Sequence, residues 1–226
     1  MEETKMPGRR PLKNGMTLSE LIEGRFEVYG NRGHIADTCH DYLNALDRFD
    51  PTVKSHTCRV ALAADRVARQ TGRDSRAAFY GGLLHDYGKI LLPAQLFDGH
   101  DVSPEEYRRI TEHAEKGFAL LKDVHLFSAL IAGLHHEMGG GGTYGIRCDE
   151  IPDDMGPETL REVVDIARII SAVDFSDAAL HRKTSYLGPE DGSLRDKMLA
   201  KFGHDEAFVD VVLSEVYRYR DLVEYE

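Results

Sequence analysis

The chain is poor in cysteine and has no long apolar run. Its three cysteines, Cys39, Cys58 and Cys148, lie far apart and lack the spacing of a zinc ribbon or a redox pair. We expect free thiols in a reducing compartment. No segment has the roughly 20 apolar residues that span a bilayer, and the N-terminal residues are polar. We therefore expect a cytoplasmic protein without a signal peptide or a membrane helix.

Basic residues are also in short supply. The chain carries 28 basic and 39 acidic residues, which gives a formal net charge of -11. Because such a surface repels polyanions, binding to duplex nucleic acid or to an anionic membrane is not expected. A small phosphorylated substrate is compatible with this charge, since metal ions and a few Lys or Arg side chains can neutralise it locally. The composition is compatible with a homodimer as well.

The remaining composition is that of a globular protein, and we expect a single domain. Apolar residues make up 42% and charged residues 30% of the 226 positions, without repeats or low-complexity tracts. No run alternates apolar and polar residues for long enough to predict a strand. We predict an all-α bundle of roughly seven to ten helices with no significant sheet. Its expected parts are a flexible arm at 1–16, a helical cap at 17–50, a core at 51–188 and C-terminal helices at 189–226 packed on the core.

Capping residues and apolar spacing predict where the helices begin and end. Asp50 with Pro51 is a favourable helix start, and that helix should end near Gly72. Ser103 with Glu106 has the form of a capping box, which predicts one helix from there to about 122. The other expected elements are two short helices within 17–50, helices at 74–86, 126–137, 157 to beyond 174, 193–202 and 205–223, and a flexible loop at 139–142.

Five histidines and two aspartates fall on, or at the end of, inward-facing stripes of the predicted helices. They are His56, His85, Asp86, His113, His135, His136 and Asp174. Imidazole nitrogens together with carboxylate oxygens suit Mn, Fe, Co, Ni or Zn better than Ca. A carboxylate can bridge two ions, and Asp86 is the expected bridge. Two ions roughly 3.5 to 4 Å apart can activate a water and hold the attacking and leaving oxygens of a phosphoryl transfer.

Two basic residues accompany these candidate ligands. Lys89 follows Asp86 by three residues and shares its helical face, where it could neutralise a phosphate oxygen or protonate a leaving group. Arg59 bears the same relation to His56. A snorkelling surface lysine is an equally good interpretation of Lys89. A hydrogen-bonded core residue is the ordinary interpretation of any single histidine, but seven such residues on converging faces favour a metal site.

The same residues give the chain a resemblance to a known family. The segments His56-Thr57-Cys58-Arg59-Val60 and His85-Asp86-Tyr87-Gly88-Lys89, with the distal Asp174, resemble the HD superfamily pattern of a His, a His-Asp doublet followed by Gly-Lys, and an Asp. The chain is also similar to the HD-GYP subgroup through Pro93, Glu105-Glu106, His113 with Gly117 and Leu120-Leu121, and His135-His136-Glu137. The similarity covers roughly residues 50 to 180.

This resemblance implies an HD-type helical bundle and a phosphohydrolase with two metals. One ion would be held by His56, His85, Asp86 and Asp174, and the second by Asp86, His113, His135 and His136. Iron or manganese is the common choice of the subgroup, while zinc, cobalt and nickel also suit these ligands. Members of the subgroup hydrolyse cyclic di-GMP to linear pGpG or GMP. We predict catalytic roles for Asp86 and Lys89 and substrate binding by Lys89, Arg59 and Tyr144.

Two departures from the subgroup narrow these expectations. After His135-His136-Glu137, only Gly141 and Tyr144 keep step with the loop that gives the subgroup its name, and the Asp and Pro of that loop are absent. A related nucleotide could therefore replace cyclic di-GMP. Thr52 stands where members with a third metal carry Glu, which predicts two ions.

Two other functions are compatible with the same pattern. Some HD-fold proteins hold a mixed-valent di-iron pair that activates oxygen, but they generally have one His where this chain has His135-His136, so His136 favours the hydrolase. A non-catalytic signalling module could instead bind a nucleotide or a partner through the glycines at 139–142. Because that segment follows a helix and lacks a Gly-Lys-Ser/Thr ending, a flexible lid is a better interpretation than a phosphate-binding loop.

Overall fold

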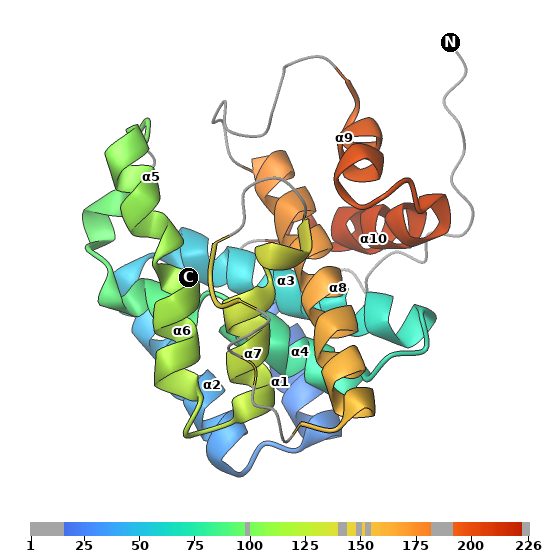
Figure 1. Cartoon of the computed structure of the whole chain (residues 1–226). Helices are drawn as coiled ribbons and strands as arrows, with labels where there is room; N and C mark the ends of the chain where they lie inside the picture. The colour runs from blue at the N-terminus through green and yellow to red at the C-terminus, as the bar shows by residue number, and fades with distance from the viewer. Residues whose placement is uncertain are drawn as a thin grey trace.

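The computed structural model describes residues 16–97, 100–139, 144–147, 151, 155–181 and 192–222. Within these residues every regular element is a helix, the helices fall in the expected range of seven to ten, and no strand occurs. The prediction of an all-α bundle is therefore confirmed (Figure 1). Most of the expected arm at 1–16, and the glycines at 140–142 of the expected loop, lie outside the described residues.

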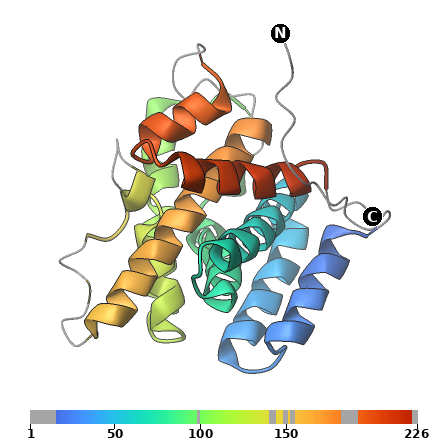
Figure 2. The ribbon, with the colours of Figure 1, turned by 90° about the vertical axis from the view of Figure 1, so that its right-hand side faces the viewer.

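The expected N-terminal cap is a pair of helices, α1 (Leu18–Tyr29) and α2 (His34–Phe49), that lie side by side (Figure 2). Thr17 begins α1 with a capping box, in which its hydroxyl accepts from the Glu20 amide at 3.2 Å. Both helices pack against α3, and the buried Asp65 of α3 is paired with Arg25 of α1 at 3.0 Å. The cap is thus part of the same packed core.

Helix α3 (Pro51–Gln70) is the centre of the bundle. It begins as predicted, because the Asp50 carboxylate accepts from the amides of Thr52 at 2.7 Å and Val53 at 3.4 Å. Helices on all sides enclose it, so nearly every residue from 54 to 68 is buried (Figure 2). Polar side chains on α3 are consequently held away from bulk water and need partners inside the protein.

The expected helix at 74–86 is shorter than predicted. It begins at the predicted cap Asp74, but α4 (Ser75–Leu84) ends before the His-Asp doublet, and a short 3-10 helix, η1 (Tyr87–Leu91), follows. A second one, η2 (Ala94–Phe97), comes next. Gly88 permits η1 to touch the next helical segment, because a Cβ at this position would lie 2.0 Å from the carbonyl oxygen of His113. Only glycine allows this close approach.

The prediction of one continuous helix from Ser103 to about 122 is wrong. Ser103 and Glu106 form the expected capping box, but the helix breaks at Glu112 into α5 (Pro104–Thr111) and α6 (His113–Leu121). The break is a tight turn in which the Glu112 amide donates to Arg109. The predicted apolar stripe fails in α5, which buries no residue and leaves Tyr107 40% exposed. Without a buried face, α5 gains little from continuing the axis of α6.

The remaining helices complete the bundle. Helices α6, α7 (Leu126–Leu134) and α8 (Pro157–His181) stand side by side, with a 3-10 turn, η3 (Glu137–Gly139), after α7 (Figure 1). Helix α9 (Leu194–Lys201) leads to α10 (Glu206–Tyr219), which crosses α3 and α8 (Figure 2). The buried Glu215 of α10 pairs with Arg66 of α3 and with Arg218. Among the helices of the described residues, none combines the length and the apolar character that crossing a bilayer requires.

Candidate metal centre

The structure brings all seven candidate ligands to one buried place between α3, α4, α6, α7 and α8. The donor atoms form three overlapping sets, and within each set they lie within 4.8 Å of one another. The sets are His56, His85 and Asp86; His85, His135 and Asp174; and His113, His135 and His136. His85 and His135 are fully buried, and Asp174 is the most open carboxylate, with 15% of its side chain exposed. The sets merge into one elongated cluster.

Three of the histidines are oriented by backbone carbonyls at helix ends. His85 follows α4, His113 follows the end of α5, and His135 follows α7. In each ring Nδ1 donates to the carbonyl three residues earlier, at 2.8 Å to Gly82, 2.6 Å to Ile110 and 2.8 Å to Ala132. Carbonyls in the last turn of a helix lack a full set of intrahelical partners. Each ring is therefore fixed with Nε2 facing the cluster.

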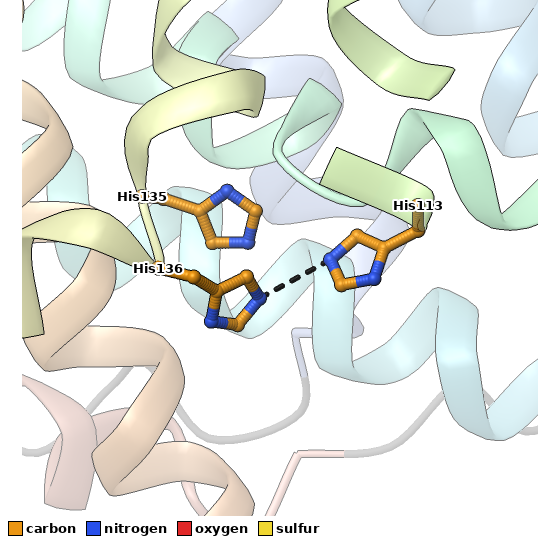
Figure 3. A group of neighbouring side chains, drawn as sticks. All are labelled: His113, His135 and His136. Carbon is orange, nitrogen blue, oxygen red and sulfur yellow. Dashed lines mark hydrogen bonds between the residues drawn. The ribbon is translucent and has the colours of Figure 1, made fainter. Parts of the chain in front are cut away.

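The distances between donor atoms match the coordination shell of an ion. His113 and His136 face each other with their Nε2 atoms 3.1 Å apart (Figure 3). The other close pairs are His56 Nε2 with Asp174 Oδ1 at 3.1 Å, His85 Nε2 with Asp86 Oδ2 at 3.2 Å, and His113 Nε2 with Asp86 Oδ1 at 3.1 Å. Two ligands at right angles, each about 2.1 Å from one ion, would be about 3.0 Å apart.

Several of these donors have nothing to bond within the described residues. The Nε2 atoms of His56, His85 and His135 are buried without a hydrogen-bond partner. Buried polar atoms are nearly always satisfied, and lone pairs that face one another repel unless a proton or a cation lies between them. The residues therefore fit divalent metal, which would give each orphaned nitrogen a partner.

Burial also sets the protonation of the rings. It lowers the pKa of His113 to about 4 and the pKa of His135 to about 3. The pKa of His136 is lowered well below its usual range by burial and by the neighbouring rings of His135 and His113. These three rings are neutral at pH 7, which is the form of histidine that ligates metal.

The two carboxylate oxygens of Asp86 face different candidate ligands. Its Oδ1 lies beside His113, and its Oδ2 lies beside His85, 3.8 Å from His56 Nε2 and within hydrogen-bond reach of Lys89. Burial alone would raise the pKa of this carboxyl group, but the charges of His85 and Lys89 hold it well below the usual range. The backbone is held too, since the buried hydroxyl of Tyr42 on α2 donates to the Asp86 carbonyl at 3.0 Å.

Lys89 is enclosed rather than exposed at the surface. It is 5% exposed, its Nζ donates to Asp86 Oδ2, and it lies 5.7 Å from the centre of the Phe97 ring. The snorkelling interpretation is therefore wrong, because a snorkelling lysine keeps its ammonium group in water. The ammonium group lies beside the candidate ligand Asp86.

Tyr144 lies over the histidines, held there by a glycine. Its ring centre is 4.1 Å from that of His136 and 5.9 Å from that of His113. The next residue, Gly145, has a φ of 110°, and a Cβ there would lie 2.1 Å from the carbonyl oxygen of Gly133 on α7. This close contact holds the backbone at residue 145 against α7, next to the position where the Tyr144 ring covers His136.

The expectation that Arg59 binds substrate is not supported by its position. Arg59 is 3% exposed, and its Nε and Nη2 donate to the two oxygens of Asp177 at 2.8 and 2.9 Å. Its Nη1 donates to the Leu222 carbonyl at 3.1 Å. These three contacts occupy the nitrogens of the guanidinium group. Its charge stabilises the Asp177 carboxylate instead.

Sequence reasoning missed two side chains beside the ligands. Asp177 lies one helical turn beyond Asp174 on α8 and accepts from His56 Nδ1 at 2.8 Å. The Asp-x-x-Asp spacing was visible in the sequence and places both carboxylates on one face of a helix. Lys201 at the end of α9 lies 5.3 Å from the centre of the Phe175 ring. Burial lowers the pKa of Lys201, and the nearby Asp174 carboxylate partly opposes this effect. No sequence pattern pointed to this second lysine.

Comparison with known proteins agrees with this geometry. The family model of the HD domain matches residues 53–179, which is more than half of the chain and lies within the expected core at 51–188. A search of curated proteins finds no match. The matched segment contains all seven converging residues, and His85-Asp86 is the doublet of the pattern. The chain therefore belongs to the HD domain family, whose members bind divalent metals and are generally metal-dependent phosphohydrolases.

Proposed function

We propose that this HD domain uses two divalent metals to hydrolyse a phosphodiester of a small nucleotide, with cyclic di-GMP as the first candidate substrate. The observation that carries the proposal is the position of Asp86, whose two oxygens face two different sets of histidine nitrogens. A carboxylate in that position is suited to bridging two ions. The convergence of all seven candidate ligands supports this proposal.

Each proposed ion has four ligands. His56, His85, Asp86 and Asp174 would hold one ion, and Asp86, His113, His135 and His136 would hold the other. Bound divalent ions supply Lewis acidity toward the phosphoryl oxygens and promote ionisation of the attacking water. We propose iron or manganese as the native metal, and zinc, cobalt and nickel would fit the same donors.

The chain's own residues supply the remaining roles. Lys89 is proposed to neutralise a phosphoryl oxygen or to give a proton to the leaving oxygen, because its ammonium group is buried beside Asp86. Lys201 offers a second positive charge near Asp174. Tyr144 is proposed to contact the substrate, since its ring covers His136 at the edge of the cluster. These roles suit an anionic substrate despite the acidic surface.

The choice of a nucleotide diester rests on the resemblance to the HD-GYP subgroup. The adjacent pair His135-His136 supports it, because both rings reach the cluster and His136 faces His113. The same pair disfavours the oxygen-activating alternative, which generally lacks the second histidine. The altered glycine loop lies mostly outside the described residues, so a related nucleotide stays an alternative substrate.

A metal-loaded activity panel tests this proposal. Purified protein loaded with Mn²⁺ or Fe²⁺ is incubated with cyclic di-GMP, other cyclic nucleotides, pGpG and a chromogenic phosphodiester, and products are separated by chromatography. We expect metal-dependent cleavage, and Asp86→Ala should abolish it. Asp123→Ala should leave the activity unchanged, because Asp123 is exposed and follows the end of α6. Absence of any product from protein shown to contain metal would refute the proposal. Oxygen consumption with product formation only in air would favour the oxygenase.

A further inference from the structure

His56 is a proposed ligand that lies inside a helix, and its ring lacks the backbone anchor that orients His85, His113 and His135. His85, His113 and His135 stand at helix ends and donate Nδ1 to backbone carbonyls three residues earlier. His56 is the sixth residue of α3, where the preceding carbonyls already accept the hydrogen bonds of the helix. Its Nδ1 instead donates to the carboxylate of Asp177, which comes from α8. The side chain of another helix therefore replaces the backbone anchor.

Asp177 is itself held by Arg59 and His181. The carboxylate is buried and Arg59 donates to both of its oxygens, while His181 Nδ1 donates to the Asp177 backbone carbonyl at 2.8 Å and lies 3.4 Å from Oδ1. A carboxylate that accepts from Nδ1 fixes the ring tautomer and leaves Nε2 with a lone pair. The Nε2 of His56 faces Asp174 and Asp86 and lacks a hydrogen-bond partner in the described residues.

The network also reaches the end of the described chain. Arg59 Nη1 donates to the carbonyl of Leu222 at 3.1 Å, and His181 Nε2 donates to the carbonyl of Arg220 at 2.7 Å. Both carbonyls belong to the short segment that follows α10. Arg59 and His181 therefore connect residues 220–222 to Asp177 from two sides.

We propose that Asp177 is the positioning residue for the metal ligand His56, and that residues 220–222 hold Asp177 in place through Arg59 and His181. The inference rests on the proposed function in one respect, since it takes His56 Nε2 as a ligand of one of two ions. Asp177 touches neither the substrate nor the ion. It acts by fixing the orientation of the imidazole.

The test is a Mn²⁺ titration of chelator-treated full-length protein, followed by calorimetry and by metal analysis after gel filtration. Wild type is expected to bind two equivalents. Asp177→Ala is expected to weaken one of the two equivalents by about 10- to 100-fold and to leave the other unchanged. His181→Ala is expected to weaken the same equivalent by a smaller factor. A purely structural role would instead affect both equivalents or neither.

Two controls separate positioning from damage to the fold. Glu215→Gln removes another buried carboxylate charge that links α10 to α3, so it should lower the unfolding temperature but preserve both Mn²⁺ equivalents. Asp177→Asn keeps the volume and one acceptor oxygen, and it should give an intermediate affinity. If Asp177→Ala does not fold by circular dichroism, Asp177→Asn carries the test. Adding Asp177→Ala to His56→Ala should cause no further loss of Mn²⁺ affinity.

The outcomes distinguish this inference from the proposed function. If wild type binds two ions and both Asp177 variants bind them equally well, the inference is overturned and the proposed function stands. If the double variant loses more affinity than His56→Ala, Asp177 does not act through His56 and the inference is again overturned. If wild type binds fewer than two ions, the proposed two-metal function fails and the inference fails with it.

Discussion

At the scale of single residues, Lys89 is the side chain whose chemistry is most open to test. The lysine is buried beside Asp86, so its ammonium group is available to a phosphoryl oxygen without being screened by water. We expect Lys89→Met to bind metal normally and to lower kcat by about 10²- to 10³-fold, as for the loss of one charge-stabilising donor. Metal analysis and steady-state kinetics on a cleaved substrate measure the two effects.

Lys116 offers the matched control for this change. It is a lysine of α6 with 34% of its side chain exposed, and its ion pair is with Glu112, outside the cluster. Lys116→Met removes the same charge and should leave kcat unchanged, while Lys89→Arg should restore part of the activity. Equal losses in Lys89→Met and Lys116→Met would show that net charge, and not the position of Lys89, is responsible.

The convergence of the seven candidate ligands was predictable from sequence, but the contacts of Arg59 were not. Histidine and aspartate on apolar stripes are costly to bury singly, which made the seven-residue set stand out. Arg59 has the same spacing from His56 as Lys89 has from Asp86, yet it turns to Asp177 on α8. Spacing places two residues on one helical face, but it does not reveal the partner that a distant helix presents.

At the scale of elements, the contact of η1 with α6 depends on Gly88. A methyl group there would collide with the backbone of His113 at 2.0 Å and of Gly117 at 2.5 Å. Since backbone cannot move aside as a flexible side chain can, we expect Gly88→Ala to destabilise the fold by about 3 kcal/mol. It should also weaken metal binding, because η1 joins Asp86 to Lys89 and packs beside His113. Urea unfolding and Mn²⁺ titration are the measurements.

Gly24 provides a comparison for Gly88 within a regular helix. It lies inside α1, and a Cβ there would meet no atom within 4 Å. Gly24→Ala should therefore leave metal binding intact and stabilise the protein by about 0.5 to 1 kcal/mol through helix propensity. If Gly88→Ala were as well tolerated as Gly24→Ala, the close approach of η1 to α6 would not exist in solution.

Helix starts were predictable from sequence to a degree that helix ends were not. Capping side chains act within one turn, so Asp50, Asp74 and Ser103 marked their helices correctly. The break at Glu112 has no signal in the local sequence. It allows His113 Nδ1 to donate to the Ile110 carbonyl and places the His113 ring inside the bundle. Such a break is stabilised by tertiary contacts that a propensity argument does not include.

At the scale of the whole molecule, the buried rings predict acid sensitivity of the metal-free protein. Burial lowers the pKa of His113 to about 4 and of His135 to about 3, whereas an unfolded histidine has a pKa of about 6.5. Below about pH 6.5 the unfolded chain thus binds more protons than the folded chain. The contribution of these two rings to the free energy of unfolding is therefore fully present above that pH and is lost as the pH drops toward 4. The raised pKa of His85 opposes part of this loss.

Urea unfolding of chelator-treated protein at pH values from 7.5 to 5 measures this dependence. We expect the free energy of unfolding to decrease steadily below about pH 6.5, and His135→Gln to reduce the slope because it removes one of the titrating rings. An unfolding free energy that stayed constant from pH 7.5 to 5 would contradict the prediction.

The cytoplasmic location and a homodimer stay predictions from composition alone.

The proposed ligands extend from residue 56 to residue 174, so a bound metal pair would cross-link much of the chain. We expect saturating Mn²⁺ to raise the unfolding temperature of wild type, with about 2.7 kcal/mol gained per ion at a hundred times its dissociation constant. Thermal scans with and without Mn²⁺ test this, and Asp86→Ala should show little response.

The same spread has a consequence for the order of events during folding. The complete set of donor atoms comes together only when α3, α4, α6, α7 and α8 have all docked, although the pairs α3–α4 and α6–α7 each bring three of the donors together. Binding of both ions should consequently occur after helix formation and after the last of these helices has docked. The release of an ion-sensitive dye during refolding would therefore measure the rate at which the native topology is completed.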